Sequence, residues 1–181
     1  SLMRVLVTRP AEDAQETVQL LAARGHEAVY APLLVTHFLD VPAPSLAGVQ
    51  AVLATSVNGI RALARLASRR DLAVFAVGPQ TAQAAQRFGF APVRNAAGDA
   101  RALAESVMRW ARPDGGALLH ASGGASAALA VALRAGGFTV HEAVLYRVEA
   151  ARSLPDHAAA ALKSGGLDAA LFFSPRSAGA F

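Results

Sequence analysis

Two stretches of this chain follow the same plan, in which an apolar strand ends at a hydroxyl residue and turns into a helix. Residues 51–54 are apolar, Thr55 and Ser56 follow, and the next apolar residues recur at helical spacing. Residues 170–173 are again small or apolar and end at Ser174, which lies 118 positions after Ser56. A buried strand that leads directly into a helix is the repeating element of α/β folds, so this plan strongly restricts the fold class.

A second pair of segments supports an internal repeat. Residues 5–10 and residues 117–122 are strands that lead through a helix to a glycine and a further strand, and they lie 112 positions apart. Two matches at nearly the same separation indicate a duplicated α/β chain. The segment at residues 76–82 then needs a counterpart at about position 195, whereas the sequence ends at Phe181. The repeat therefore predicts that the chain is incomplete.

The predicted strands are continuous apolar runs joined by helices, which is typical of parallel sheets covered on both faces. Two polar segments, residues 36–45 and 148–153, interrupt the alternation and are predicted to connect domains. We expect an outer α/β domain of residues 3–35 and 152–181 and an inserted α/β domain of residues 36–151. The inserted domain has about five strands. The outer domain has fewer strands, and two further strand–helix units, roughly fifty residues in all, would be needed to complete it.

Composition excludes several classes of function. The sequence has no cysteine and its five histidines show no paired ligand spacing, so neither disulfides nor a metal site are expected. The net charge of +4 comes from scattered arginines and only 6% of the residues are aromatic, so nucleic acid is not an expected partner. No apolar run approaches the roughly 20 residues of a membrane span, and no signal pattern is present. We expect a cytoplasmic protein without a membrane partner.

Candidate ligand-binding residues lie where the predicted strands end, because open parallel sheets bind ligands at that edge, near the N-termini of helices. They are almost all hydroxyl, amide or glycine residues, which favours binding of carboxylates or phosphates over activation of a nucleophile. The same residue types are preferred helix N-caps, so each has a structural alternative. The segments are Thr8-Arg9-Pro10, Thr55-Ser56-Val57-Asn58, Gly78-Pro79-Gln80-Thr81, Ser122-Gly123-Gly124 and Ser174-Pro175-Arg176-Ser177.

Motifs of several common enzyme classes are missing. The sequence has no phosphate loop of the GxxxxGK[ST] type, no GxGxxG after the first strand and no GxSxG elbow. His120 ends a predicted strand and is interpreted as structural. Tyr146 ends the last predicted strand of the inserted domain, where its phenol either donates a proton to a leaving oxygen or simply packs. The residues alone favour packing.

Five motifs together resemble the uroporphyrinogen-III synthase family in their order and spacing. They are Val5-Leu-Val-Thr-Arg-Pro10, Leu53-Ala-Thr-Ser-Val-Asn-Gly59, Val77-Gly-Pro-Gln-Thr-Ala82, Leu145-Tyr-Arg147 and Phe172-Phe-Ser-Pro175. The resemblance covers the whole chain and implies two flavodoxin-like parallel-sheet domains joined by a two-stranded linker, with the substrate between them. It also implies that the C-terminal units of the first domain, including a second glycine–threonine turn, are missing, so that the sequence is either partial or an inactive fragment.

The activity that the resemblance implies is that of a cofactor-free lyase, a hydro-lyase of porphyrin and heme biosynthesis. Members of the family cyclise hydroxymethylbilane, a linear tetrapyrrole, to uroporphyrinogen III with inversion of ring D and loss of water. The substrate carries eight carboxylates, which agrees with a donor-rich site on a mildly basic protein. The alternative is a non-catalytic, two-lobed domain of the same fold that binds anions or tetrapyrroles, or acts as a sensor.

The resemblance also assigns roles to individual residues. Tyr146 corresponds to the tyrosine proposed to assist departure of the hydroxyl group. The implied partners are the polycarboxylate substrate and, by hand-over of that substrate, the preceding enzyme of the pathway, and the expected state is a monomer. Thr55 and Ser122 are candidates from their strand-end positions, and the positions that match the family's substrate-binding residues are Thr8, Arg9, Ser56, Asn58, Gly78, Thr81, Ser174 and Ser177.

Overall fold

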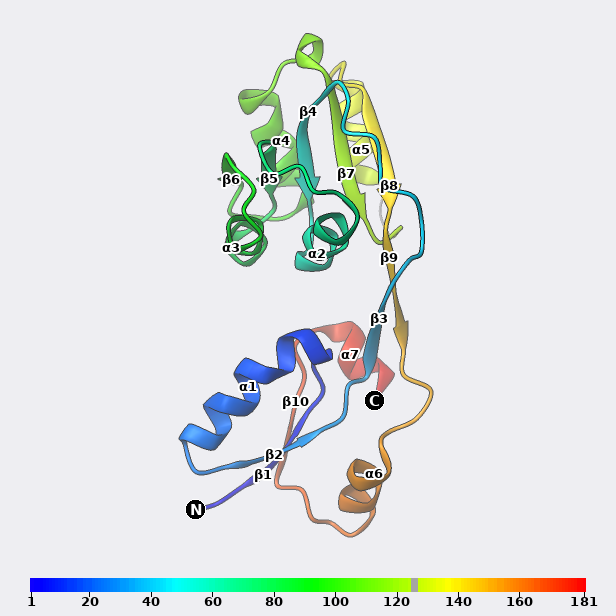
Figure 1. The fold of residues 1–181 in the computed structure, drawn as a ribbon. Helices are drawn as coiled ribbons and strands as arrows, with labels where there is room; N and C mark the ends of the chain where they lie inside the picture. Colours follow the sequence, from blue (N-terminus) through cyan, green and yellow to red (C-terminus); the bar gives the residue numbers. More distant parts are fainter. Residues whose placement is uncertain (125–126) are drawn as a thin grey trace. The chain divides into compact units, whose positions relative to one another are not determined.

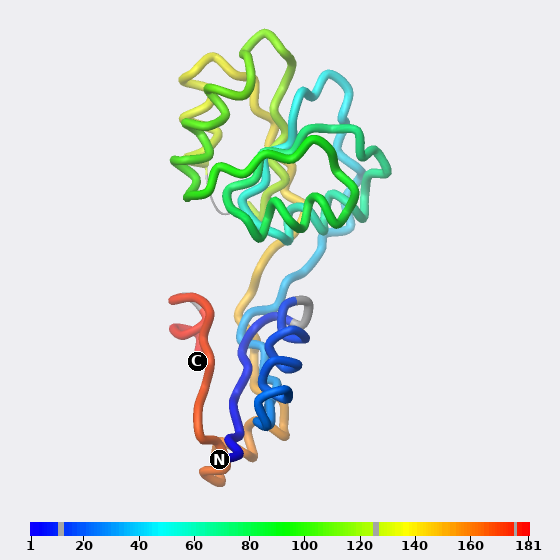
Figure 2. Tube along the Cα trace, turned by 90° about the vertical axis from the view of Figure 1, so that its left-hand side faces the viewer, coloured from blue at the N-terminus to red at the C-terminus, as the bar shows by residue number. Residues whose placement is uncertain are grey.

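The computed structural model of the chain describes residues 1–124 and 127–181. Its contacts divide the chain into two compact units, an outer unit of Ser1–His37 and Val148–Phe181 and an inserted unit of Phe38–Arg147. The trace passes between the units twice (Figures 1 and 2). The sequence predicted that the chain leaves the outer domain after residue 35 and returns to it at residue 152. In the structure the chain leaves the outer unit after His37, two residues later, and returns at Val148, four residues earlier.

The outer unit contains a three-stranded parallel sheet. Its elements are β1 (Arg4–Val7), α1 (Ala11–Ala23), β2 (Glu27–Tyr30), α6 (Asp156–Lys163), β10 (Ala169–Leu171) and α7 (Pro175–Ala180). The strand order is β10-β1-β2, so the first strand of the chain lies between strands from the two ends of the sequence. The buried core packs Leu6 and Val29 from the sheet against Ala158 of α6. Burial of these apolar side chains holds the two distant chain segments together.

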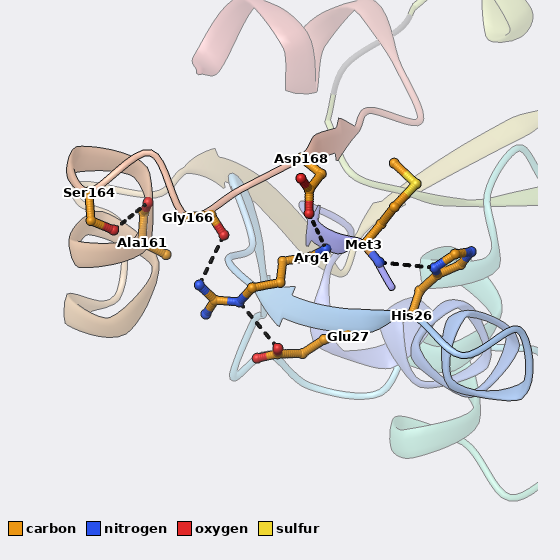
Figure 3. A network of polar contacts seen from close by, with 8 residues as sticks. All are labelled: Met3, Arg4, His26, Glu27, Ala161, Ser164, Gly166 and Asp168. Carbon is orange, nitrogen blue, oxygen red and sulfur yellow. Dashed lines mark hydrogen bonds and ion pairs between the residues drawn. The ribbon is translucent and has the colours of Figure 1, made fainter. Parts of the chain in front are cut away.

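Arg4 connects the N-terminal ends of all three strands (Figure 3). Its backbone N–H donates to Oδ2 of Asp168 at 2.7 Å, and its Nη1 donates to the carbonyl oxygen of Gly166 at 2.9 Å. Its Nε donates to Oε2 of Glu27 at 3.2 Å. Asp168 directly precedes β10 and Glu27 begins β2. The network therefore supports the strand register at the edge opposite to the candidate site residues.

The inserted unit contains a five-stranded sheet with the order β6-β5-β4-β7-β8 (Figure 1). Every neighbouring pair in it is parallel, which confirms the predicted parallel-sheet α/β class. Its elements are β4 (Val49–Ala54), α2 (Val57–Leu66), β5 (Ala73–Ala76), α3 (Pro79–Arg87), β6 (Val93–Asn95), α4 (Ala100–Trp110), η1 (Pro113–Gly115), β7 (Ala117–Ser122), α5 (Ala128–Ala135) and β8 (Val140–Val144).

Both faces of this sheet are buried. Ala51 and Leu53 of β4 belong to a core cluster with residues of α4 and α5. Val52 points to the opposite face, because side chains alternate along a strand, and it is also fully buried. Ile60 and Leu63 of α2 are fully buried as well, and α2 packs against β4, β7 and α3. Continuous apolar strands such as β4 are therefore explained by helices on both sides.

Two further strands, β3 (Leu34–Phe38) and β9 (Tyr146–Ala150), form a separate two-stranded sheet. The segments 36–45 and 148–153, predicted to connect the domains, are partly strand, because β3 and β9 extend into them, and the predicted strand that ends at Tyr146 is divided between β8 and β9. The division is at Leu145. Its N–H donates to the carbonyl of Ser122, whereas its carbonyl accepts from the N–H of Leu39, so the backbone changes partners there.

The sheet order follows the internal repeat. The repeat equates β7 with β1, β8 with β2 and β4 with β10, and the neighbours β4-β7-β8 indeed correspond in order to β10-β1-β2. If the strands are numbered from β7, with β4 following β8, the inserted sheet has the order 2-1-3-4-5 that is found in flavodoxin-like sheets. If they are numbered along the chain from β4, the order is 3-2-1-4-5. Within the described residues, β10 pairs along one edge only, whereas β4 pairs along both.

Candidate functional site

Ser56 and Ser174, the residues equated by the repeat, adopt the same N-cap geometry. Ser56 has φ −152° and ψ 157° and its hydroxyl accepts from the N–H of Gly59, while Ser174 has φ −156° and ψ 155° and accepts from the N–H of Ser177. Each satisfies a helix donor that has no partner within the helix. The capping alternative is thus confirmed for both serines, and any ligand contact would be additional.

Several candidate residues meet at the carboxyl edge of the inserted sheet. The register places Leu53 of β4 opposite His120 of β7, and His120 opposite Glu142 of β8. The residues at and just after these strand ends are linked by hydrogen bonds between their side chains. We refer to this group as the strand-end cluster, which consists of Thr55, Ser56, His120, Ser122, Glu142 and Tyr146.

Tyr146 begins β9, and its phenol oxygen lies 2.5 Å from Oγ of Ser56. Only 7% of Tyr146 is exposed, so the phenol is largely buried within the inserted unit. The sequence alone favoured packing for this residue, and the ring is indeed packed, but its hydroxyl also has a specific partner. A buried phenol normally needs such a partner for its polar end.

Thr55 and His120 form the second pair of the cluster, with 3.1 Å between Oγ1 and Nε2. His120 is 2% exposed, and its Nδ1 is buried without a hydrogen-bond partner among the described residues. Burial lowers the pKa of His120 because it disfavours the charged imidazolium, and the nearby Glu142 carboxylate acts in the opposite direction. A neutral ring is therefore favoured, which supports the structural interpretation of His120.

The free energy of unfolding of the inserted unit is expected to decrease as the pH falls below 6.5, the ordinary pKa of histidine. The lowered pKa of His120 means that the unfolded chain binds the proton first. The stabilisation is fully present above pH 6.5 and is lost as the pH falls through the folded-state pKa. One proton contributes a slope of at most about 1.4 kcal/mol per pH unit. Urea unfolding followed by the fluorescence of Trp110, the single tryptophan, measures this slope.

His120→Gln should remove this contribution to the slope, because the substituted side chain does not titrate. The exposed His141 on the neighbouring strand provides the matched control, and His141→Gln should retain the wild-type slope. Equal pH dependence in His120→Gln and wild type would contradict the interpretation of His120 as a buried, neutral imidazole.

Ser122 donates its hydroxyl hydrogen to Oε1 of Glu142 at 2.8 Å and accepts from the N–H of Gly124 at 2.8 Å. Ser122 is one of the residues predicted from its strand-end position to bind carboxylates or phosphates. The hydroxyl hydrogen is already used by Glu142, and a carboxylate ligand would be repelled by this like charge. The structure therefore favours a structural role for Ser122. Sequence reasoning missed Glu142 because only the β7–β8 register brings it to this edge.

The remaining candidates of the inserted unit belong to α2 and α3. Asn58, in the first turn of α2, accepts a hydrogen bond at Oδ1 from Nη1 of Arg61 at 3.2 Å. Gly78 is the N-cap of α3, and among the described residues no heavy atom beyond Gly78 and its chain neighbours lies within 4 Å of the position that a Cβ would take there. Thr81 is buried in α3. Of the three, Gly78 offers the most accessible backbone.

The candidates of the outer unit lie at the ends of β1 and β10. Thr8 is buried and donates its hydroxyl hydrogen to the carbonyl of Leu171. The Arg9 guanidinium lies 4.3 Å from the ring centroid of Phe173, a cation–π contact, and donates to Thr17 at 3.3 Å. Oγ of Ser174 donates to Oγ of the buried Ser177 at 3.2 Å. Each of these side chains thus has a partner in its own unit.

Comparisons with known proteins were made on sequence and on structure. The family model described as uroporphyrinogen-III synthase HemD matches residues 15–181. A triple-methionine variant of uroporphyrinogen III synthase from Thermus thermophilus is 22% identical with a TM-score of 0.57, covering 98% of this chain and 75% of that chain. The synthetase from Helicobacter pylori is 14% identical with a TM-score of 0.62, covering 99% and 76%. These two structures show a shared fold. A search of curated proteins gave no match.

Proposed function

The chain belongs to the uroporphyrinogen-III synthase family, and from this premise we propose that it cyclises hydroxymethylbilane to uroporphyrinogen III, inverting ring D and releasing water. This makes it a lyase of the carbon–oxygen class in porphyrin and heme biosynthesis. The reaction loses water without net oxidation or reduction, so we propose that it needs no redox cofactor. We also propose that both units are flavodoxin-like domains, and the sheet order counted from β7 supports this for the inserted unit.

The observation that carries the proposal is the hydrogen bond between Tyr146 and Ser56 in the strand-end cluster. Loss of the hydroxyl group requires the carbon–oxygen bond to break, with its electron pair going to oxygen. A proton donated by the phenol of Tyr146 converts the departing oxygen into water. Such general acid catalysis contributes about 10²–10⁴-fold to a rate.

Positioning of the substrate is the second part of the proposed mechanism. Apart from Ser122, the hydroxyl, amide and glycine residues at the strand ends can donate hydrogen bonds, and Arg9 adds a positive charge. We propose that these groups bind substrate carboxylates, among them the accessible backbone of Gly78, and so hold the tetrapyrrole for ring closure. No covalent nucleophile is required. We propose that this polycarboxylate is the partner and that the preceding enzyme of the pathway hands it over. The proposed state of the protein is a monomer.

Conversion of hydroxymethylbilane tests the function. The protein at its full natural length is mixed with hydroxymethylbilane, and the isomers of the uroporphyrinogen product are separated by chromatography. Formation of the type III isomer at a rate proportional to protein concentration is expected. Tight binding of the tetrapyrrole with only the type I isomer, as in a blank without protein, would instead support the non-catalytic binding or sensor domain.

No helix in the described part of the chain is long and apolar enough to cross a membrane. Over the same residues, no group of three or more histidine, aspartate or glutamate side chains is arranged to hold a metal ion.

A further inference from the structure

We propose that Ser56 and Gly123 are positioning residues for the phenol of Tyr146. Ser56 donates its hydroxyl hydrogen to the phenol oxygen, and Gly123 provides a side-chain-free surface against which the ring fits in this position. The inference rests on the proposed role of Tyr146 as the acid, but it assigns to these two residues a role that neither helix capping nor substrate binding explains.

Gly123 lies in close contact with the ring. A Cβ added at Gly123 would lie 2.7 Å from Cε2, 2.8 Å from Cζ and 3.1 Å from the hydroxyl oxygen of Tyr146. Carbon atoms in van der Waals contact are about 3.5–4.0 Å apart. A methyl group at this position therefore cannot be accommodated unless the ring moves. Gly123 does not have a positive φ, so its requirement for glycine arises from space and not from backbone conformation.

The hydrogen-bond capacity of Ser56 favours donation from Ser56 to Tyr146 in a bond in which either oxygen could be the donor. Its oxygen already accepts from the N–H of Gly59 at 3.2 Å, which leaves one hydrogen and one lone pair. Within the described residues, the phenol is the remaining partner of this hydroxyl. If Ser56 accepted a second bond, its own hydrogen would have no acceptor there. Donation from Ser56 uses that hydrogen and leaves the phenol proton of Tyr146 available.

The backbone before Tyr146 is held on both sides. The N–H of Leu145 donates to the carbonyl of Ser122 at 2.9 Å, and the carbonyl of Leu145 accepts from the N–H of Leu39 at 2.9 Å. Leu145 itself is buried. The Cα position of Tyr146, the face of its ring and its hydroxyl are thus fixed by Leu145, Gly123 and Ser56 respectively. Precise placement of an acid matters, because small displacements reduce the rate strongly.

The donated hydrogen bond also explains how the phenol can lose its proton. When Tyr146 protonates the leaving oxygen, a negative charge develops on the phenol oxygen. The bond from Ser56 then joins a neutral donor to an anion, and such charge-assisted bonds are shorter and stronger. Ser56 therefore stabilises the state in which Tyr146 has given up its proton, and this role is separate from any contact of Ser56 with a substrate carboxylate.

A double-mutant cycle tests the proposal in the full-length protein. Ser56→Ala and Gly123→Ala are each expected to lower kcat for type III formation by about 10- to 100-fold, the range for a hydrogen bond to a charged group, with little change in KM. Neither substitution should lower kcat further when Tyr146→Phe is already present, because both act through the phenol. If Ser56→Ala and Gly123→Ala lower kcat by the same factor in the wild-type protein and in Tyr146→Phe, the proposal is overturned.

Matched variants separate positioning from helix capping and from the general effect of replacing glycine. Ser56→Thr keeps the hydroxyl and should restore most of the rate. Asp99→Ala removes the N-cap of α4, where Oδ1 accepts from Ala102 at 2.9 Å, and should keep kcat. Gly179→Ala adds a Cβ that meets no heavy atom within 4 Å in the described part of the chain outside its own helix backbone and chain neighbours, and should also keep kcat. Gly123→Ala leaves the Ser56 cap intact, so it tests the ring position even if Ser56→Ala folds poorly.

A spectroscopic readout is independent of activity. The sequence contains two tyrosines, Tyr30 and Tyr146, so protein with 13C-labelled tyrosine rings gives two sets of ring signals, assigned with Tyr146→Phe. Ser56→Ala and Gly123→Ala should shift the signals of Tyr146 and leave those of Tyr30 in place. Unchanged Tyr146 signals in both variants would overturn the proposal. Absence of type III product from wild type would instead contradict the proposed function and leave this test intact.

Discussion

Replacement of Tyr146 by phenylalanine is expected to lower kcat for formation of the type III isomer by about 10²–10⁴-fold, the usual contribution of a general acid. The phenyl ring can occupy the same space against Gly123, and the change removes only the hydroxyl and its bond with Ser56. Loss of one such bond costs about 0.5–1.5 kcal/mol of stability, so the variant should remain folded. Initial rates of type III formation at saturating substrate measure the effect.

Tyr30→Phe is the matched control for this change. Tyr30 ends β2 in the outer unit and is the other tyrosine of the sequence, so its substitution should leave kcat close to that of wild type. A Tyr146→Phe protein that keeps the wild-type rate would show that the phenol only packs. That outcome would restore the interpretation that the sequence context alone favoured for Tyr146.

Gly59→Ala is expected to destabilise the inserted unit by about 1–3 kcal/mol, although alanine is normally the better helix residue by about 1 kcal/mol. Gly59 lies in the first turn of α2, where a Cβ would lie 2.5 Å from the carbonyl oxygen of Ala121 in β7. That oxygen belongs to a buried central strand, so it cannot move away without disturbing the sheet. Urea unfolding followed by Trp110 fluorescence gives the change in free energy of unfolding.

Gly78→Ala provides the comparison within the same unit. It also places a methyl group at the start of a helix, at the N-cap of α3, but in the part of the chain that the structure describes no heavy atom other than those of its chain neighbours lies within 4 Å of it. Alanine is a poorer N-cap than glycine, so this substitution should lower the free energy of unfolding by less than about 1 kcal/mol. An equal free energy of unfolding for Gly59→Ala and Gly78→Ala would contradict the close packing of α2 on β7. Because Ser56 is the N-cap of α2, that result would also contradict its placement in the strand-end cluster.

Local sequence was sufficient to predict the elements that depend on local pattern. The apolar run before Ser56 predicted a buried strand, and the Ser56 hydroxyl predicted an N-cap, as the structure has them. The pairing of β3 with β9 was not predictable in this way, because these strands are short, only partly buried, and separated by more than a hundred residues. The polar residues of β3 and β9 are typical of segments that connect domains, so these segments were predicted as connections.

The candidate site was predictable in most of its members, Glu142 excepted, but not in their contacts. Ser56 and Tyr146 were each identified from the sequence, whereas their hydrogen bond depends on where β8 ends and β9 begins. Glu142 becomes a partner of Ser122 only through the register of β7 and β8. Gly123 gave a recognisable signal, a glycine pair directly after a strand, but a glycine pair predicts a turn and not the aromatic ring that lies against it.

The isomer composition of the product is the most direct test of the account. Hydroxymethylbilane closes without an enzyme to the type I isomer, so type III can arise only if the protein positions ring D before closure. The account predicts predominantly type III from wild type and, at equal protein concentration, a product dominated by type I from Tyr146→Phe. Exclusive formation of type I by folded, full-length wild-type protein would contradict it.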